Sequence, residues 1–559
     1  MGYQLSPGVN VSEIDLTTVV PSVLTTAGAF TGTFKWGPVN KIMLIDNEIT
    51  LSKTFGTPTS NSAISFFTAA NFLAYGNNLS VVRAVGANSF NAAANTLARV
   101  QVANSDAFHY SYLGQNNNNA LGAFIARYPG TLGNSLSVTV IDTGNTARSD
   151  LFSSVPGTSD FVSNAGGAND EIHIAVVDAG GLFTGTKNTV LETFPFVSKA
   201  SNAIKSNDGS TNYYKQVIFN NSKYIYAVDP ADYSNTTSTW GTTGTTSFGS
   251  INPKMINYTL SAGTDELPTD GNVCAGYNLF NNKETVDISL LLTGAANTTI
   301  QQYVMDIAKS RADCVAFISP PSATVINNAG NESAGITSWV NGLTPSSYVV
   351  ADSGWKYQFD IYNNVYRWIP LNGDIAGLCV YTDNIRDPWY SPAGFNRGTI
   401  KNAIKLAWNP TKTYRDAIYS VGVNPVASFP GNGVTLFGDK TLQAKPSAFD
   451  RINVRRLFIV LEKAIAKAAQ YSLFEFNDEF TRAQFVALLT PYLRDVKGRR
   501  GITDFRVVCD ETNNTPQVID SNQFVGDIYI KPARSINFIQ LNFIAVGTGV
   551  EFLTVVGAV

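Results

Sequence analysis

Cysteine and histidine are scarce in this chain of 559 residues, and the few that occur lie far apart. The cysteines are Cys274, Cys314, Cys379 and Cys509, and the histidines are His109 and His173. No two cysteines form a Cys-x-x-Cys pair and no histidine joins them, so the spacing matches neither a zinc site nor a disulfide framework. We therefore predict no metal, no cofactor and four reduced thiols, most of them buried.

Charge is also sparse. Only 14% of the residues are charged and the formal net charge is -3, whereas nucleic-acid binding depends on many Lys and Arg contacts with phosphates. Apolar runs such as Ser289–Leu292 are far too short to span a bilayer. The N-terminal residues lack the basic and apolar regions of a signal peptide. The sequence thus predicts no nucleic-acid partner, no membrane insertion and synthesis in a cytoplasm.

Two segments could carry chemistry, and each has a simpler interpretation. Gly433–Thr441 resembles a phosphate-binding loop, but such a loop needs Lys directly after its second Gly, and Asp439 stands there. A surface turn explains these glycines. Asp265, Glu266 and Asp270 could supply the paired carboxylates of a hydrolase, although a solvated acidic loop is the simpler interpretation. We predict that the chain is not an enzyme and keep the hydrolase as an alternative of another class.

The pattern of apolar residues indicates a mixed α+β protein. Residues 27–34 and 79–85 are typical of buried strands, and 63–74 has apolar residues near helical spacing. From about 131 to 335 short strands and polar turns dominate, and 235–250 consists largely of Thr, Ser and Gly. The further elements expected in this region are strands over 136–141 and 172–177, a helix over 300–312 and a buried strand over 314–318.

The last quarter of the chain begins with the strongest predicted helix, over about 447–473. A second helix should start after Thr481, an acceptable N-cap, and Pro491 should kink it or end it early. Strands are expected over 505–510, 524–530 and 536–543.

A basic cluster follows the second helix. It consists of Arg494, Lys497, Arg499 and Arg500. These cations could bind an acidic partner, or they could simply be favoured at the C-terminal end of a helix dipole.

Both ends of the chain carry apolar residues that no obvious core would cover. Val9, Val11 and Ile14 lie in an extended N-terminal segment, and Phe552, Leu553, Val555 and Val556 lie near the C-terminus. An uncovered apolar, β-prone terminus invites aggregation unless a partner pairs with it. We expect both arms to contact neighbouring subunits.

Several segments resemble contractile tail sheath proteins of T-even-like myoviruses. The N-terminal half offers Leu5–Val9, Phe34–Pro38, Tyr75–Leu79 and Val82–Val85. The C-terminal half offers Ile375–Asn384, Trp389–Gly398, Phe449–Phe458, Val507–Pro516 and Pro532–Asn537. The resemblance extends along the whole chain but is weak over 87–335. The stretch between Val85 and Tyr128 is much shorter than in the longest family members.

The resemblance implies a multidomain organisation with an α/β core domain, a β-rich outer domain and a small inner domain completed by the two arms. It assigns the chain as follows: N-terminal arm 1–21, core 22–86, short peripheral insertion 87–130, outer domain 131–335, core 336–480, and inner domain with C-terminal arm 481–559.

The resemblance also implies the assembly. Six subunits would form a ring around the tail tube, and stacked rings would contract without nucleotide hydrolysis to drive the tube through the host envelope. The implied partners are further copies, the tail tube protein, the baseplate and the tail terminator, all within the virion. A bacterial contractile injection system or tailocin remains an alternative with the same architecture. A surface-layer protein or adhesin is disfavoured, because no signal peptide is expected.

Overall fold

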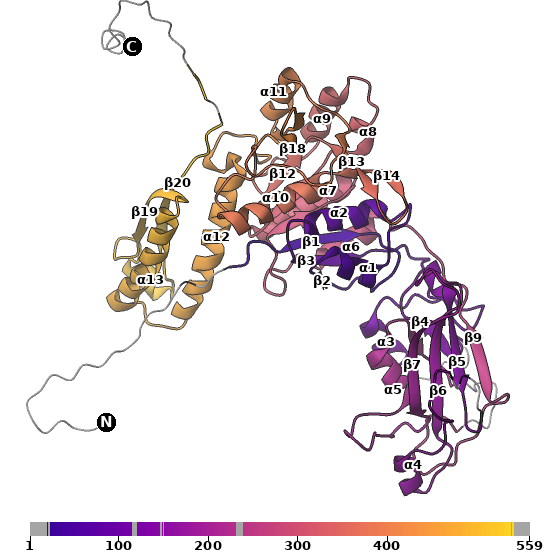
Figure 1. The fold of residues 1–559 in the computed structure, drawn as a ribbon. Coiled ribbons are helices and arrows are strands. Elements are labelled where there is room, and N and C mark those ends of the chain that lie inside the picture. The colour runs from indigo at the N-terminus through magenta and orange to yellow at the C-terminus, as the bar shows by residue number, and fades with distance from the viewer. Residues whose placement is uncertain are drawn as a thin grey trace, which may run out of the picture. The chain divides into compact units, whose positions relative to one another are not determined.

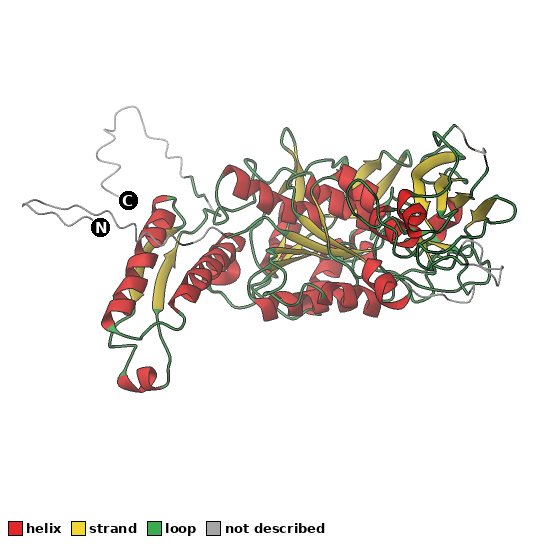
Figure 2. Cartoon of the chain, turned by 90° about the horizontal axis from the view of Figure 1, so that it is seen from below, coloured by secondary structure: helices red, strands yellow, loops and turns green. Residues whose placement is uncertain are grey.

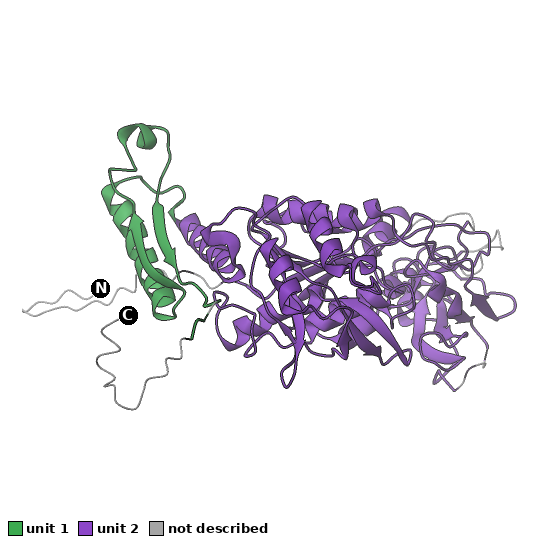
Figure 3. Ribbon diagram, turned by 90° about the horizontal axis from the view of Figure 1, so that it is seen from above, with its two compact units in different colours: residues 1–19, 472–559 green, residues 20–471 purple. Residues whose placement is uncertain are grey.

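The computed structural model describes residues 20, 23–113, 120–145, 148, 150–230, 239–537 and 539–541. The chain divides into two compact units (Figure 3). Unit 1 comprises residues 1–19 and 472–559, and unit 2 comprises residues 20–471. Helices and strands are mixed within both units, which confirms the predicted α+β class. The predicted arm residues Val9, Val11, Ile14, Phe552, Leu553, Val555 and Val556 lie outside the described residues.

A seven-stranded sheet forms the centre of unit 2 (Figure 1). In spatial order its strands are β16 (Val423–Asn424), β12 (Val349–Asp352), β11 (Val315–Ile318), β10 (Leu290–Leu292), β1 (Gly28–Gly32), β3 (Leu79–Arg83) and β2 (Met43–Ile45). All neighbouring strands are parallel except β2, which runs antiparallel to β3. Both faces of the inner strands are covered, and β10 (LLL) and β11 (VAFI) consist of apolar residues throughout.

Helices pack on both faces of this sheet (Figure 2). On one face α2 and α10 cover side chains such as Phe30 and Phe317. On the other face α6, α7 and α9 cover Ala29 and Ala316. The helices of this core are α1 (Glu48–Phe55), α2 (Ala63–Leu73), α6 (Asp270–Asn278), α7 (Thr298–Arg311), α8 (Ser322–Val325), α9 (Glu332–Asn341), α10 (Asn372–Ile385) and α11 (Lys412–Ser420).

Two small sheets and a long helix complete the core. The first sheet contains β14 (Val365–Pro370), β13 (Trp355–Asp360) and β15 (Lys405–Leu406), and the second contains β17 (Val426–Phe429) and β18 (Gly433–Leu436). The chain then passes through η2 (Ala448–Asp450) into α12 (Ile452–Ala469) and η3 (Gln470–Ser472). The predicted helices over 63–74 and 300–312 are confirmed as α2 and α7, and the central part of 447–473 is confirmed as α12.

Residues 87–265, here called the β-rich subdomain, form a separate hydrophobic cluster within unit 2, to which the core adds Trp36. Its strands are β4 (Phe124–Ala126), β5 (Leu136–Ile141), β6 (Glu171–Asp178), β7 (Thr189–Ser198), β8 (Ile225–Ala227) and β9 (Met255–Thr259). Its helices are α3 (Ser105–Ser111), η1 (Thr131–Ser135), α4 (Asp160–Ala165) and α5 (Tyr214–Asn221). The main sheet has the antiparallel order β7-β6-β5-β9, and β4 pairs with β8.

The predicted boundaries of this region need two corrections. The outer domain was predicted over 131–335, but its last part belongs to the core, because β10 and β11 pair with each other and β10 with β1 in the central sheet. A three-residue apolar strand carries no sign in the sequence of which sheet it joins. Residues 87–130 are not a separate insertion, because Ala93 bridges both Ile125 and Ser261 within the β-rich subdomain. The predicted surface loop over 235–250 also contains the buried Trp240 and Phe248.

Unit 1 is built on α13 (Glu479–Gly498) and a two-stranded antiparallel sheet of β19 (Ile502–Val508) and β20 (Asp527–Pro532), with α14 (Pro516–Asp520) between the strands. The N-cap of α13 is Asp478, which accepts a hydrogen bond from the Thr481 N–H at 2.8 Å, so Thr481 lies inside the helix. Pro491 does not end α13. It is exposed, as is Ala487, whose carbonyl loses its helical partner, so water can satisfy that group.

The final predicted strand, 536–543, is not a strand over its described residues. Ile536, Ile539 and Leu541 are 71–82% exposed there. Apolar alternation alone was therefore not enough to form a strand within this copy of the chain.

Candidate assembly site and coupling contacts

The segment that resembled a phosphate-binding loop is closed by its own contacts. Residues Gly433–Leu436 form β18 instead of a turn. Asp439 is buried and lies 3.1 Å from the Arg451 guanidinium. Thr441 is also buried, and its hydroxyl donates to the Phe449 carbonyl at 2.7 Å. Both groups that would face a phosphate or its metal therefore hold the start of α12.

The three carboxylates of the predicted acidic loop contact three different segments. Asp265 accepts from both the N–H and the hydroxyl of Thr131. Glu266 accepts from the Asn88 N–H at 2.7 Å and its side-chain amide at 3.0 Å. Asp270 accepts from the Asn297 amide at 2.8 Å. The hydrogen bonds from Asn88 lower the pKa of Glu266, whereas a hydrolase acid needs a raised pKa. Of the three, the contact of Glu266 with Asn88 joins the core to the β-rich subdomain.

The carboxyl ends of the parallel strands, where open α/β sheets commonly bind ligands, are filled by a buried polar network. The Ser319 hydroxyl donates to Asp352 at 2.6 Å and accepts from the Asn372 amide at 2.9 Å. Asn372 also donates to the Gly294 carbonyl at 2.8 Å. Burial raises the pKa of Asp352 to about 8. Because these groups bond to one another, they stabilise the core and present no open site.

The histidines and cysteines have structural surroundings. His173 is buried between the rings of Phe152 and Phe196, and it accepts from the Phe196 N–H through Nδ1 at 3.0 Å. Burial lowers its pKa. All four cysteines are free, and the burial of three of them confirms the prediction that most are buried. Within the described ranges no group of His, Cys, Asp and Glu side chains could hold a metal ion. Among the described helices none is long and apolar enough to cross a membrane.

Arg83 joins the core to the β-rich subdomain. Its side chain is 1% exposed and lies at the end of β3. It donates to the carbonyl groups of Phe34, Gly37 and Pro129, each at 2.9 Å. Burial lowers its pKa to about 10, against the opposing influence of Asp265, so the guanidinium stays charged near neutral pH. One buried cation on β3 therefore links the core segment 34–37 to Pro129 of the subdomain.

The start of α12 is fixed to the core by three polar side chains in its first two turns, Asn453, Arg455 and Arg456. Arg456 donates to both carboxylate oxygens of Asp383 in α10, at 2.7 and 2.6 Å, and the side chains are 5% and 4% exposed. Burial alone would lower the pKa of Arg456, but Asp383 outweighs it and the net direction is upward. Arg455 donates to the Ser347 hydroxyl at 2.7 Å, and Asn453 donates to the Trp389 carbonyl at 3.3 Å.

Further along α12, Lys463 lies 2.8 Å from Asp287 and donates to the Ile288 carbonyl at 2.8 Å. The helix is thus held by the core over at least three turns. It is the last helix of unit 2 before the chain enters unit 1.

Unit 1 contains the predicted basic cluster. Lys497 pairs with Asp504 at 3.0 Å, and Arg499 lies 3.6 Å from Asp495. Arg494 and Arg500 are exposed, and Arg500 has a φ of 66° just after α13. The structure brings the four cations to the last turns of α13 and its end, as the sequence indicated, but two of them already have acidic neighbours.

Three models of sheath domains match the chain. "Tail sheath protein Gp18 domain III N-terminal region" matches residues 27–84, "Phage tail sheath protein central domain" matches 281–442 and "Phage tail sheath C-terminal domain" matches 444–545. The first two ranges supply the strands of the seven-stranded sheet. All three ranges lie outside the β-rich subdomain.

Similarity to individual proteins extends over the whole chain. The tail sheath protein of Vibrio phage KVP40 is 33% identical over 99% of this chain and 100% of its own length. The tail sheath protein of Enterobacteria phage T4 is 33% identical over 98% of both chains. The KVP40 alignment spans 688 positions, so that relative carries insertions that this chain lacks. In fold, the contracted sheath complex of an extracellular contractile injection system (PVC) gives a TM-score of 0.52 at 13% identity, covering 97% and 98% of the two chains.

The fold and its internal contacts are those of a structural subunit. Its cores are packed, and its two units are joined through α12, which side-chain contacts hold to the core of unit 2. The chain belongs to the phage tail sheath protein family. The resemblance drawn from the sequence motifs is thereby confirmed. As a tail sheath protein it is a component of a contractile tail and of the virion.

Proposed function

We propose that six copies of this chain form a ring around a tail tube and that stacked rings form a helical sheath. Contraction of that sheath drives the tube through the envelope of the host cell. The 33% identity to two phage sheath proteins, which extends over nearly the full length of each, favours a phage tail over a bacterial injection system or tailocin. The neighbouring genes test this choice, because capsid and terminase genes would support a virus and their absence would contradict it.

The observation that carries this proposal is the small sheet of unit 1. Among the described residues β19 and β20 pair only with each other, which leaves both outer edges of the sheet open. A two-stranded sheet gains stability from further strands, and an extended segment can add to such an edge by backbone hydrogen bonds. We propose that the N-terminal arm (Val9, Val11, Ile14) and the C-terminal arm (Phe552, Leu553, Val555, Val556) of neighbouring copies supply those strands.

Truncation tests the arms. A chain lacking residues 1–16 and a chain lacking 547–559 should fold with unchanged circular dichroism and remain dispersed, while the full-length chain forms tubes in electron micrographs. Tubes of normal length from either truncated chain would overturn the proposal about that arm.

We propose that the basic cluster faces the tail tube protein, with the baseplate and the tail terminator as the partners at the two ends. The exposed Arg494 is the best probe, because no acidic side chain among the described residues pairs with it. Arg494→Glu should weaken co-sedimentation with assembled tubes. Lys205→Glu, an exposed position in the β-rich subdomain, should leave it unchanged, and equal effects of the two variants would contradict this orientation.

We propose that contraction uses no nucleotide and that its free energy is stored during assembly. The closed Gly433–Thr441 segment offers no phosphate site. Rigid units can keep their cores while the contacts between subunits change, and a kinetic barrier can hold the extended state. Purified tails in chelator and without ATP should contract when treated with mild acid or denaturant. Contraction that requires added nucleotide or metal would contradict this mechanism.

A further inference from the structure

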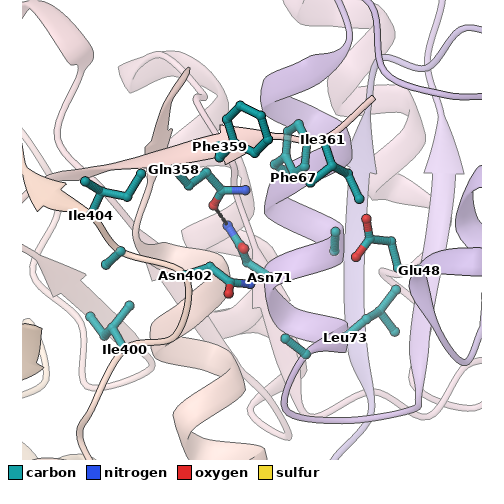
Figure 4. A pocket seen from close by; sticks show the side chains of 13 residues that line it. Glu48, Phe67, Asn71, Leu73, Gln358, Phe359, Ile361, Ile400, Asn402 and Ile404 are labelled. Carbon is teal, nitrogen blue, oxygen red and sulfur yellow. Dashed lines mark hydrogen bonds between the residues drawn. The ribbon is translucent and has the colours of Figure 1, made fainter. Parts of the chain in front are cut away.

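A groove with a volume of about 640 Å³ opens in unit 2 between α2, β13 and the segment 400–404 (Figure 4). Phe67 and Leu73 of α2 and Ile400 form its buried floor, each less than 10% exposed. The rim is formed by Phe359 and two isoleucines on opposite sides (Figure 4).

The rim of the groove is unusually apolar for a surface. Ile361 is 67% exposed, Ile404 58% and Phe359 39%. Single exposed apolar residues are common, but an apolar rim around an apolar floor marks an interaction site. A partner that brings apolar side chains would cover this surface, and the burial would lower the free energy of the complex.

Two of the polar side chains that line the groove bond to each other, and a third, Asn402, is exposed. The Asn71 side-chain amide donates to Gln358 Oε1 at 2.8 Å, and both residues are at most 4% exposed. At the rim Glu48 accepts from the Tyr362 hydroxyl at 3.0 Å. Small-molecule sites depend on a few polar groups free to orient the ligand, so an apolar polypeptide segment suits this groove better.

The charges beside the groove are mainly positive. Lys401 and Lys405 flank the lining segment 402–404 and are exposed, against the single carboxylate of Glu48. The Lys401 ammonium donates to the Ala74 carbonyl at 2.7 Å, at the end of α2. A partner segment with apolar side chains and several carboxylates would be complementary in both respects.

The chain itself carries such a segment in unit 1, residues 473–480. Its apolar side chains are 63–106% exposed, namely Leu473, Phe474, Phe476 and Phe480. Its carboxylates are those of Glu475, Asp478 and Glu479. The hydrogen bonds at the start of α13 lower the pKa of Asp478, which keeps that group charged.

We propose that in the assembled sheath the groove of one copy binds segment 473–480 of a second copy. This inference rests on the proposed function, because only a polymer brings many copies together at the required concentration. The aromatic side chains of the segment cover Phe359, Ile361 and Ile404, and its carboxylates approach Lys401 and Lys405. The contact complements the arms, because it joins unit 1 of one copy to the core of another.

Mixed cross-linking tests the contact between copies. One preparation carries Ile361→Cys and the other Phe474→Cys, and the two are assembled together and treated with a short bismaleimide. We expect a covalent dimer in mixed sheaths that neither variant forms alone. Three of the native cysteines are buried and Cys274 is half-buried, so background labelling is low. A control pair of Leu182→Cys, 58% exposed in the β-rich subdomain, with Phe474→Cys should give no dimer.

A second measurement separates this inference from the proposed function. Ile404→Asp should raise the critical concentration for assembly at least tenfold while the melting temperature of the subunit stays unchanged. If wild-type chains assemble and mixed sheaths give no Ile361–Phe474 dimer, the inference is wrong although the sheath function stands. A dimer of Ile361→Cys with the tube protein instead would also overturn it. If wild-type chains never form tubes, the proposed function itself fails.

Discussion

The guanidinium of Arg456 and the carboxylate of Asp383 form two hydrogen bonds of 2.7 and 2.6 Å between α12 and α10. Both side chains are nearly inaccessible to water. In such a pair the attraction offsets the cost of desolvating the charges, so the loss of one partner leaves an uncompensated buried charge. The start of α12, the helix that leads towards unit 1, is therefore held by an ion pair that stabilises the fold only while both partners are present.

Asp383→Ala should destabilise unit 2 by about 3–5 kcal/mol, the usual cost of breaking a buried ion pair from one side. Urea unfolding followed by circular dichroism measures the difference. Lys497→Met removes the exposed pair with Asp504, whose side chains are 45% and 58% exposed, and should change stability by less than about 1 kcal/mol. Similar losses in the two variants would show that the Arg456–Asp383 pair does not anchor α12.

The buried carboxyl of Asp352 should make stability depend on pH. Burial raises its pKa in the folded protein from 3.8 to about 8. Between these values the unfolded chain releases the proton and the folded chain retains it, so stability falls as pH rises, by at most about 1.4 kcal/mol per pH unit. The contribution is fully present below pH 4 and lost once pH passes through about 8.

Asp352→Asn removes this titration and keeps a side chain of similar shape beside Ser319 and Gly354. The difference in unfolding free energy between variant and wild type should therefore increase from pH 5 to pH 8 in favour of the variant. Denaturant unfolding at four pH values measures it. A difference that is constant over this range would mean that Asp352 is already ionised at pH 5.

Arg83→Lys should loosen the connection between the core and the β-rich subdomain. The guanidinium reaches three carbonyl groups in fixed directions, and an ammonium cannot match that geometry. Because buried carbonyl groups that lose a charged donor are costly, we expect a loss of about 2–3 kcal/mol and faster proteolytic cleavage between residues 84 and 91. Arg99→Lys, at an exposed arginine within the subdomain, is the control. Unchanged cleavage in the Arg83 variant would show that the joint lies elsewhere.

The sequence indicated the type of most long elements but not the contacts that join them. Helix α2 and strands β1, β3 and β11 follow from apolar spacing and continuous apolar runs. The β-rich subdomain could not be delimited, since β10 resembles any other short buried strand. Likewise Arg83 and Arg456 lie in segments that marked the family, yet their partners Pro129 and Asp383 are 46 and 73 residues away. Only the folded chain brings these pairs together.

Local chemistry also decided details that periodicity left open. Asp478 precedes Thr481 by three residues and accepts its N–H, which makes the aspartate the cap. In the stretch 235–250 the composition suggested a fully exposed loop, but Trp240 packs against Tyr214 with ring centroids 5.6 Å apart. The aromatic residues Trp240 and Phe248 in this polar stretch were the signal of burial.

Insertion of a short tag should be tolerated at one tip of the β-rich subdomain and not at another. Asp208 and Gly209 form an exposed turn in which the Lys205 carbonyl accepts from the Gly209 N–H at 3.0 Å. Loop tips of this kind accept insertions because little buried surface is lost. A tag of about eight residues placed there should leave the melting temperature and tube formation unchanged, and its antibody should label assembled sheaths if the subdomain faces outward.

The same tag placed directly after Trp240 would displace a ring that is 6% exposed and should lower stability by about 3 kcal/mol or more. Thermal unfolding and immunogold labelling measure both outcomes, and loss of tubes with the tag at Asp208 would place this tip between subunits instead.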